Sequence, residues 1–136
     1  MAENLKQLLL QRSEWFAREI MKEVRTGPYG FLTPAQSRLL AHMGGKPSSM
    51  AELARRLAIS RQAVHKTVVE LVRRGILEVR VDPQRRNSRL VVYTDEGRAL
   101  NRAGAAVIAR TEAKIARKIG ATDLRRMREL LAQDWD

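Results

Sequence analysis

The segment Ser-Arg-Gln-Ala-Val-His-Lys, residues 60–66, lies at the start of one predicted helix. Several of its side chains could form hydrogen bonds with a partner molecule. Arginine can donate two parallel hydrogen bonds to guanine, and glutamine can pair in the same way with adenine. A helix that presents such residues in its first turns is typical of proteins that read bases in the DNA major groove. The candidate base-reading residues are Ser60, Arg61, Gln62, Ala63, His65 and Lys66.

A second basic segment, Pro-Gln-Arg-Arg-Asn-Ser at 83–88, lies between two stretches that have the composition of strands. Arginines at the tip of a hairpin can contact phosphates, or can enter a narrow minor groove whose negative potential attracts them. Arg85 and Arg86 are the candidates at the tip, and Arg89 is the candidate at its base. The alternative for both basic segments is a solvated surface, where these polar residue types are also common.

The net charge favours a polyanionic partner because it is concentrated in one part of the chain. Lysine and arginine number 26 against 15 acidic residues, for a net charge of +11. Residues 46–89 alone hold eleven basic and four acidic side chains, so most of the excess lies there. A focused basic region of this kind is the electrostatic footprint of nucleic-acid binding. A generally arginine-rich surface without such a partner is the alternative.

Other classes of chemistry lack the residues they need. The chain has no cysteine, which excludes disulfides and thiol switches, and its two histidines do not stand in a metal-ligand spacing. No nucleophile–base set or phosphate loop is visible, so we expect no enzyme, no metal and no cofactor. No apolar run approaches the roughly 18 residues of a membrane helix, and the N-terminus lacks signal-peptide character. We therefore expect a cytoplasmic protein that does not enter membranes.

The segments that must position the basic residues are mostly helices, because apolar residues recur at helical spacing. Thr33, Ser49, Ser60 and Thr94 are suited to cap the starts of four of them, and Thr122 to cap the last. Only Ile59 and Ser60 are predicted to separate the two central helices, as in a helix-turn-helix. The predicted helices cover 3–25, 34–43, 50–58, 61–74, 95–118 and a short final segment through Leu130 and Leu131.

The pattern changes to that of strands at residues 76–82 and 89–94, with 83–88 as the loop of a β-hairpin. Two helices followed by a hairpin form a winged helix-turn-helix. The predicted fold class is therefore mainly α with a small β-hairpin wing (α+β).

The segment 50–100 resembles the core of the MarR family of transcription regulators, and "LTPAQSRLLAHM" resembles the family's preceding helix. "DP" opens the wing and "YTDEGRAL" matches the family's LTxxGxxL ending, with Tyr93 where leucine is usual. The resemblance implies one MarR-like domain over 1–136, with a winged DNA-binding lobe at 31–94 and dimerisation helices at 3–25 and 95–133. It also implies a homodimer that binds double-stranded DNA at a pseudo-palindromic operator, most simply as a repressor.

Several alternatives stay open beside this interpretation. They are a monomer with a packed helical cap, a nonspecific architectural DNA-binding protein and a winged domain used for protein contact. The wing also departs from the family pattern, because Arg85-Arg86-Asn87 stands where the family usually carries Asp-x-Arg. The assignment of a wing arginine to Arg85 or Arg86 therefore does not follow from the resemblance alone.

Many members of the family release DNA when a small aromatic or phenolic ligand binds. Residues that could line such a pocket here are Trp15, Phe16, Phe31, His42 and Met43. The same side chains would serve equally as ordinary core residues, and His42 is expected in a helix near the core. A switch by cysteine oxidation is excluded by composition.

Overall fold

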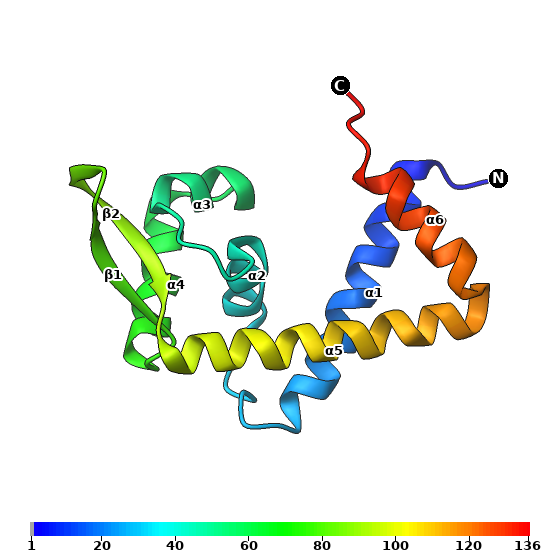
Figure 1. Cartoon of the computed structure of the whole chain (residues 1–136), viewed down its shortest axis with the longest axis horizontal. Coiled ribbons are helices and arrows are strands. Elements are labelled where there is room, and N and C mark those ends of the chain that lie inside the picture. Colours follow the sequence, from blue (N-terminus) through cyan, green and yellow to red (C-terminus); the bar gives the residue numbers. More distant parts are fainter. Residues whose placement is uncertain (1) are drawn as a thin grey trace. The chain divides into compact units, whose positions relative to one another are not determined.

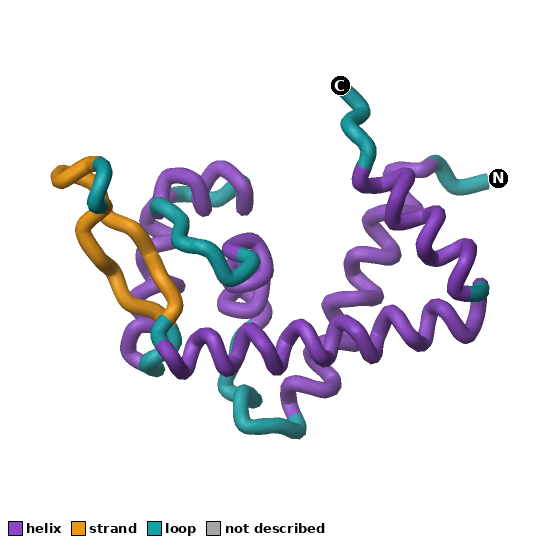
Figure 2. Tube along the Cα trace, viewed as in Figure 1, coloured by secondary structure: helices purple, strands orange, loops and turns teal. Residues whose placement is uncertain are grey.

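The computed structural model describes residues 2–136 and has six helices and one two-stranded antiparallel hairpin (Figures 1 and 2). This confirms the predicted fold class. In chain order the elements are α1 (Leu5–Arg25), α2 (Pro34–Met43), α3 (Met50–Leu57), α4 (Arg61–Arg73), β1 (Leu77–Asp82), β2 (Arg85–Tyr93), α5 (Asp95–Ile119) and α6 (Ala121–Ala132). Among residues 2–136, none of these helices combines the length and apolarity that crossing a bilayer requires.

The chain divides into two compact units. The winged unit is Val24–Gly104 and contains α2, α3, α4, the hairpin and the first part of α5. The helical unit consists of the described residues up to Glu23 together with Ala105–Asp136. The predicted lobe at 31–94 falls entirely within the winged unit.

The core of the winged unit is built from the apolar faces of α2, α3 and α4, closed by the base of the hairpin. Leu39, Leu53 and Val64 represent the three helices in this core and are almost fully buried. Burial of a leucine or valine side chain contributes about 1.5–3 kcal/mol to folding, so these contacts fix the helices against each other. Other members of the core are Leu32, Leu40, Met43, Leu57, Val68, Leu71, Ile76, Leu77, Val91, Tyr93 and Leu100.

Side-chain caps fix where α2 and α3 begin. Thr33 and Gln36 form a reciprocal capping box at the start of α2. At α3 the Ser49 hydroxyl accepts a hydrogen bond from the Glu52 backbone N–H at 3.1 Å and donates one to the Glu52 carboxylate at 3.2 Å. The cap predicted at Ser49 is therefore present, and the Glu52 carboxylate bonds to the Ser49 side chain.

The turn between α3 and α4 has three residues, Ala58 to Ser60, and not the two that the sequence predicts. Ala58 adopts a left-handed conformation with φ 54°, and its N–H bonds to carbonyls of the last turn of α3. Glycine or asparagine usually occupies such a position. The sequence around Ala58 therefore gives no signal that α3 ends one residue early.

The hairpin is longer and its loop shorter than predicted. Arg85 already belongs to β2, so only Pro83 and Gln84 lie between the strands, and the prediction of a six-residue loop at 83–88 is wrong. Val81 pairs with Arg89 but Asp82 pairs with Arg85, so residues 86–88 bulge out of the ladder. The Asp82 carboxylate accepts a hydrogen bond from the Gln84 N–H at 2.9 Å and closes the tip.

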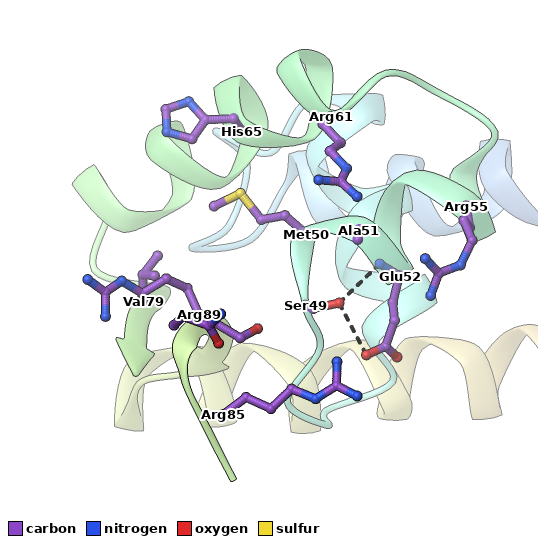
Figure 3. A pocket seen from close by; sticks show the side chains of 12 residues that line it. Ser49, Met50, Ala51, Glu52, Arg55, Arg61, His65, Val79, Arg85 and Arg89 are labelled. Atoms are coloured by element: carbon purple, nitrogen blue, oxygen red, sulfur yellow. Dashed lines mark hydrogen bonds between the residues drawn. The ribbon is translucent and has the colours of Figure 1, made fainter. Parts of the chain in front are cut away.

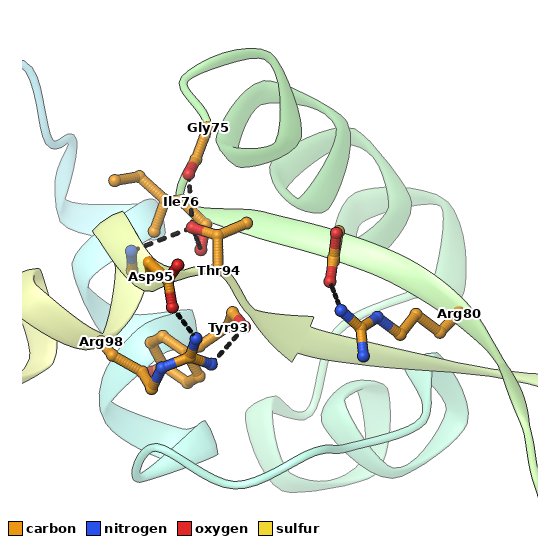
Figure 4. Close-up of polar contacts among 9 residues, drawn as sticks. Gly75, Ile76, Arg80, Tyr93, Thr94, Asp95 and Arg98 are labelled. Carbon is orange, nitrogen blue, oxygen red and sulfur yellow. Dashed lines mark hydrogen bonds and ion pairs between the residues drawn. The ribbon is translucent and has the colours of Figure 1, made fainter.

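Thr94 joins the hairpin to α5 (Figure 4). Its hydroxyl accepts a hydrogen bond from the Gly97 N–H at 3.0 Å and donates to the Ile76 carbonyl at 3.0 Å. A Cβ atom at Gly97 would collide with the same Ile76 carbonyl oxygen, so this close approach requires glycine. The "TDEG" segment thus fixes the base of the wing to the start of α5.

Within the helical unit, α1 and the second part of α5 are joined by ion pairs. Arg110 donates to the Glu23 carboxylate at 2.7 Å, and Lys114 lies 3.6 Å from Glu19. The last helix, α6, begins after Gly120, which is its N-cap without a side-chain hydrogen bond. Thr122 is therefore inside α6, and the prediction that it caps the helix is wrong.

We predict that Tyr93→Phe lowers the free energy of unfolding by about 1 kcal/mol at neutral pH. Tyr93 is buried, and its hydroxyl donates to the Leu40 carbonyl at 3.1 Å, which joins β2 to α2. Burial raises the pKa of Tyr93 above 10.0, and a hydrogen bond from the Gly45 backbone offsets this only in part. Above pH 10 the unfolded chain then releases this proton before the folded one, so stability falls.

Urea unfolding from about pH 8 to pH 11 checks this. The wild-type chain should lose stability faster than Tyr93→Phe in the alkaline part of the range. Tyr29→Phe is the matched control and should follow the wild type, because Tyr29 is only partly buried. Parallel curves for the wild type and Tyr93→Phe would contradict the role given to this hydroxyl.

Candidate nucleic-acid interface

Helix α4 has one buried face and one exposed face. Val64, Val68 and Leu71 are fully buried and hold the helix to the core. Ser60 is the N-cap, and its hydroxyl accepts a hydrogen bond from the Ala63 N–H at 3.1 Å. Of the predicted base-reading residues, Ala63 is partly buried, whereas Ser60, Arg61, Gln62, His65 and Lys66 are exposed.

An open groove of about 810 Å³ connects the start of α3, the exposed face of α4 and the wing (Figure 3). Figure 3 shows Arg61 from α4 and Arg85 from β2, with Ser49 and Met50 between them in the view. Beside it, a smaller hollow of about 460 Å³ is bordered by Met50, Arg61, Gln62, His65 and Lys66. The large groove is lined by Ser49, Met50, Ala51, Glu52, Arg55, Arg61, His65, Val79, Arg85, Asn87, Ser88 and Arg89.

The groove carries positive charge that the protein does not neutralise. Its four arginines, at positions 55, 61, 85 and 89, form no ion pair with any carboxylate among residues 2–136. Glu52 is the only acidic residue in the lining, and its carboxylate is already paired with Arg56 at 3.3 Å. Four like charges around one groove create a field that attracts an anion.

Other arginines of the winged unit show the contrast. Arg98 pairs with Asp95 and Arg80 with Glu78 (Figure 4), while the Arg74 guanidinium lies 4.4 Å from the centre of the Phe31 ring. These side chains serve the fold. The arginines of the groove are left to solvent, and their N–H groups are directed donors that suit phosphates and base edges.

The structure brings most of the predicted contact residues together. Arg61, His65, Arg85 and Arg89 line one groove, although they come from segments that are up to 28 positions apart. Gln62 and Lys66 border the adjacent hollow. Arg86 lies in the bulge and does not line the groove, so the two tip arginines are not equivalent.

Arg55 is a groove residue that the sequence analysis did not identify. It lies in the last turn of α3 and is exposed. Arg55 follows Ala51 by one helical turn, and residues four apart share a helix face. The spacing from Ala51 would therefore have indicated Arg55 as a groove residue, but only with the knowledge that the start of α3 lies beside the wing. Only the tertiary structure shows this proximity.

The five residues of the predicted ligand pocket fall in both units. Trp15 and Phe16 belong to the helical unit and contact each other edge to face, with ring centroids 5.3 Å apart. In the winged unit Met43 is a core residue and Phe31 packs under Arg74. His42 is exposed, so the expectation that it lies near the core is wrong. The pocket stays a prediction.

Among residues 2–136, no group of three or more histidine, aspartate or glutamate side chains could hold a metal ion.

A comparison with known protein families gives a match for part of the winged unit. Residues 32–86 match the MarR family. An uncharacterized protein of Mycobacterium tuberculosis (strain ATCC 25618 / H37Rv) is 36% identical over 66 residues, which cover 48% of this chain and 46% of that protein. A protein of Mycobacterium bovis matches to the same extent, so the chain spans about half the length of these curated relatives.

Solved structures show the same fold over nearly the full length. Wild-type MarR of E. coli superposes with a TM-score of 0.77 at 18% identity, covering 96% of each chain. MepR, a transcription regulator of the Staphylococcus aureus multidrug efflux pump MepA, superposes with a TM-score of 0.69 at 16% identity, covering 95% of this chain and 94% of MepR. Residues 32–86 thus carry the sequence of the MarR family, and the chain has the fold of the MarR winged-helix regulators.

Proposed function

We propose that this chain is a sequence-specific regulator of transcription that binds double-stranded DNA. The observation that carries the proposal is the groove whose four arginines come from α3, α4 and the wing and form no ion pair with a carboxylate of residues 2–136. An exposed helix face beside a basic hairpin suits a DNA duplex, because the helix fits the major groove and the hairpin reaches the adjacent backbone.

The proposed division of labour follows from the positions of the side chains. Arg61 and Gln62 stand in the first turn of α4, where they can reach base edges and supply selectivity. Arg55, Arg85 and Arg89 line the same groove as Arg61 and suit phosphates, whose contacts supply affinity and orientation. Displacement of counterions by these arginines provides the driving force, and no catalytic step is needed.

We further propose that the active form is a homodimer that represses transcription from a pseudo-palindromic site. Support comes from the helical unit, where large apolar side chains remain exposed. The side chains of Leu10 and Trp135, for example, are 57% and 63% exposed. The others are Leu5, Leu8 and Leu9 of α1, Ile108 and Ile119 of α5, and Met127, Leu130 and Leu131 of α6. Exposed apolar surface of this extent is typical of a protein–protein interface.

Release of DNA by a small aromatic or phenolic ligand, and a cytoplasmic location, are proposed from the resemblance to the family. The competing functions are nonspecific architectural DNA binding and protein contact. Selection of duplexes from a random library discriminates among them. A two-fold symmetric consensus with half-sites about one helical turn apart, roughly 34 Å, supports the proposed function.

We predict that Arg61→Ala flattens the preference among selected duplexes. Loss of a bidentate contact to a base should cost about 1–3 kcal/mol at one position of the site and leave binding to scrambled DNA much less affected. Competition titration with single-base variants of the selected duplex measures this. Unchanged selectivity would show that Arg61 does not read a base.

We predict that Arg85→Ala lowers the slope of log affinity against log salt by about 1, because one phosphate contact is lost. The double variant Arg85→Ala/Arg86→Ala should lower it by up to about 2 if Arg86 also reaches the backbone. Arg102→Ala, which removes the same charge from α5 outside the groove, is the matched control. An unchanged slope in the double variant would remove the wing from the phosphate contacts.

We predict that the chain sediments as a dimer at micromolar concentration. The variant Leu8→Glu/Leu130→Glu should sediment as a folded monomer, because both side chains are exposed in the single chain and their replacement creates no buried charge. Circular dichroism checks that the variant keeps its helices. A monomeric wild-type chain would exclude the two-half-site arrangement.

A further inference from the structure

Gln36 is a buried polar side chain of α2 that uses both ends of its amide. It is 6% exposed. Its Oε1 accepts a hydrogen bond from the Thr33 N–H at 3.2 Å and completes the capping box of α2. Its Nε2 donates to the Glu70 carboxylate of α4 at 2.8 Å. One side chain thus connects the start of α2 to the second half of α4.

Glu70 is the only acidic residue of α4. It lies one turn after Lys66, a spacing at which opposite charges often pair on a helix. Among residues 2–136, however, no ion pair joins them, and the hydrogen bond of Glu70 goes to Gln36. The carboxylate of Glu70, the one negative charge of α4, therefore bonds to Gln36 of α2. Lys66 stays unpaired with it on the exposed face of α4 and can contact a partner.

A second contact holds α4 at nearly the same place. The Arg74 guanidinium, directly after α4, lies over the Phe31 ring, and Phe31 packs edge to face on Tyr29. Both contacts join the end of α4 to the segment 29–36. Among residues 2–136, no side-chain hydrogen bond or ion pair joins Arg61 or Gln62, at the start of α4, to another element, and this end is held through the buried apolar face of the helix.

Because the polar contacts of α4 lie near its end, a small change in the angle of the helix there is amplified at the side chains of its start. Arg61 and Glu70 are nine positions apart, or about 14 Å along the axis at 1.5 Å per residue. A tilt of about 5° at Glu70 would thus move Arg61 by about 1 Å, whereas a binding geometry tolerates about 0.5 Å. Base contacts are directional and would suffer first, while phosphate contacts by flexible arginines would adapt.

We propose that Gln36 is a positioning residue for α4. By holding Glu70 it fixes the angle at which Arg61 and Gln62 meet the bases, and so determines sequence selectivity without touching DNA. This inference rests on the proposed function of sequence-specific DNA binding.

The test uses Gln36→Glu in the full-length chain. Glutamate at this position still accepts the hydrogen bond from Thr33, so the cap of α2 is kept, but a second carboxylate now faces Glu70. The ratio of affinities for a library-selected duplex and a scrambled duplex of the same composition should fall about tenfold. Ala35→Glu adds the same charge to an exposed position of α2 and should leave the ratio unchanged.

The swapped pair Gln36→Glu/Glu70→Gln is the rescue variant. It again places one amide and one carboxylate opposite each other, with the amide now at position 70, so that the hydrogen bond between α2 and α4 can form. It should return the ratio to within about twofold of the wild type, which lost helix stability alone would not produce. If Gln36→Glu is unfolded in a thermal melt, Glu70→Ala replaces it. That variant leaves the capping box of α2 intact and should also lower the ratio.

The outcomes separate the two proposals. A wild-type chain with equal affinity for both duplexes refutes sequence-specific binding itself, and the inference with it. A selective wild-type chain with an unchanged ratio in Gln36→Glu, or in Glu70→Ala where that variant is used, overturns the positioning role alone. A lowered ratio that the swapped pair does not restore overturns it as well. A lowered ratio with rescue supports it.

Discussion

The burial of one face of α4 is the constraint on which the rest of the winged unit depends. Val64, Val68 and Leu71 are fully buried, and at helical spacing their burial leaves the polar residues of the first two turns on the opposite side. Removal of one such side chain would cost about 1–4 kcal/mol, a large part of the stability of a small domain. The exposed face cannot rotate inward without this loss, so the same contacts that fold the unit also present Arg61 and Gln62.

Several arginines of the winged unit pair with carboxylates, whereas the four that line the groove do not. Arg56, Arg80 and Arg98 meet carboxylates close by in sequence, at a separation of two to four positions. Glu52 and Asp82 stand three positions before Arg55 and Arg85, but among residues 2–136 no ion pair joins them, and Glu52 is already engaged by Arg56. Exposed ion pairs contribute little stability, so this arrangement costs the fold little. Because these arginines are unpaired, the groove keeps its positive potential, which would attract a polyanion.

The sequence predicted most of the helix starts, which local capping determines, although not the start of α6, and it missed contacts between distant residues. Helix starts at Thr33, Ser49 and Ser60 follow from capping, and they were predicted correctly. The early start of β2 at Arg85 was also missed, although Arg85 pairs with Asp82 only three positions away. The Gln36–Glu70 bond joins residues 34 positions apart, and no local pattern encodes it. For the same reason the groove residue Arg55 was missed, although the residues of α4 and the wing that line the groove were predicted.

The wing shows how the departure from the family's Asp-x-Arg pattern is accommodated. The carboxylate that shapes the tip is Asp82, and it accepts a hydrogen bond from the backbone of Gln84 without engaging an arginine. The tip is thereby closed by main-chain geometry, while Arg85 and Arg89 keep their full donor capacity toward the groove. An arginine held by an aspartate would be better pre-organised, and an unpaired one loses more side-chain entropy when it binds. This wing therefore gains charge at the expense of rigidity, which in the proposed complex with DNA would favour contacts to the backbone and leave selectivity mainly to α4.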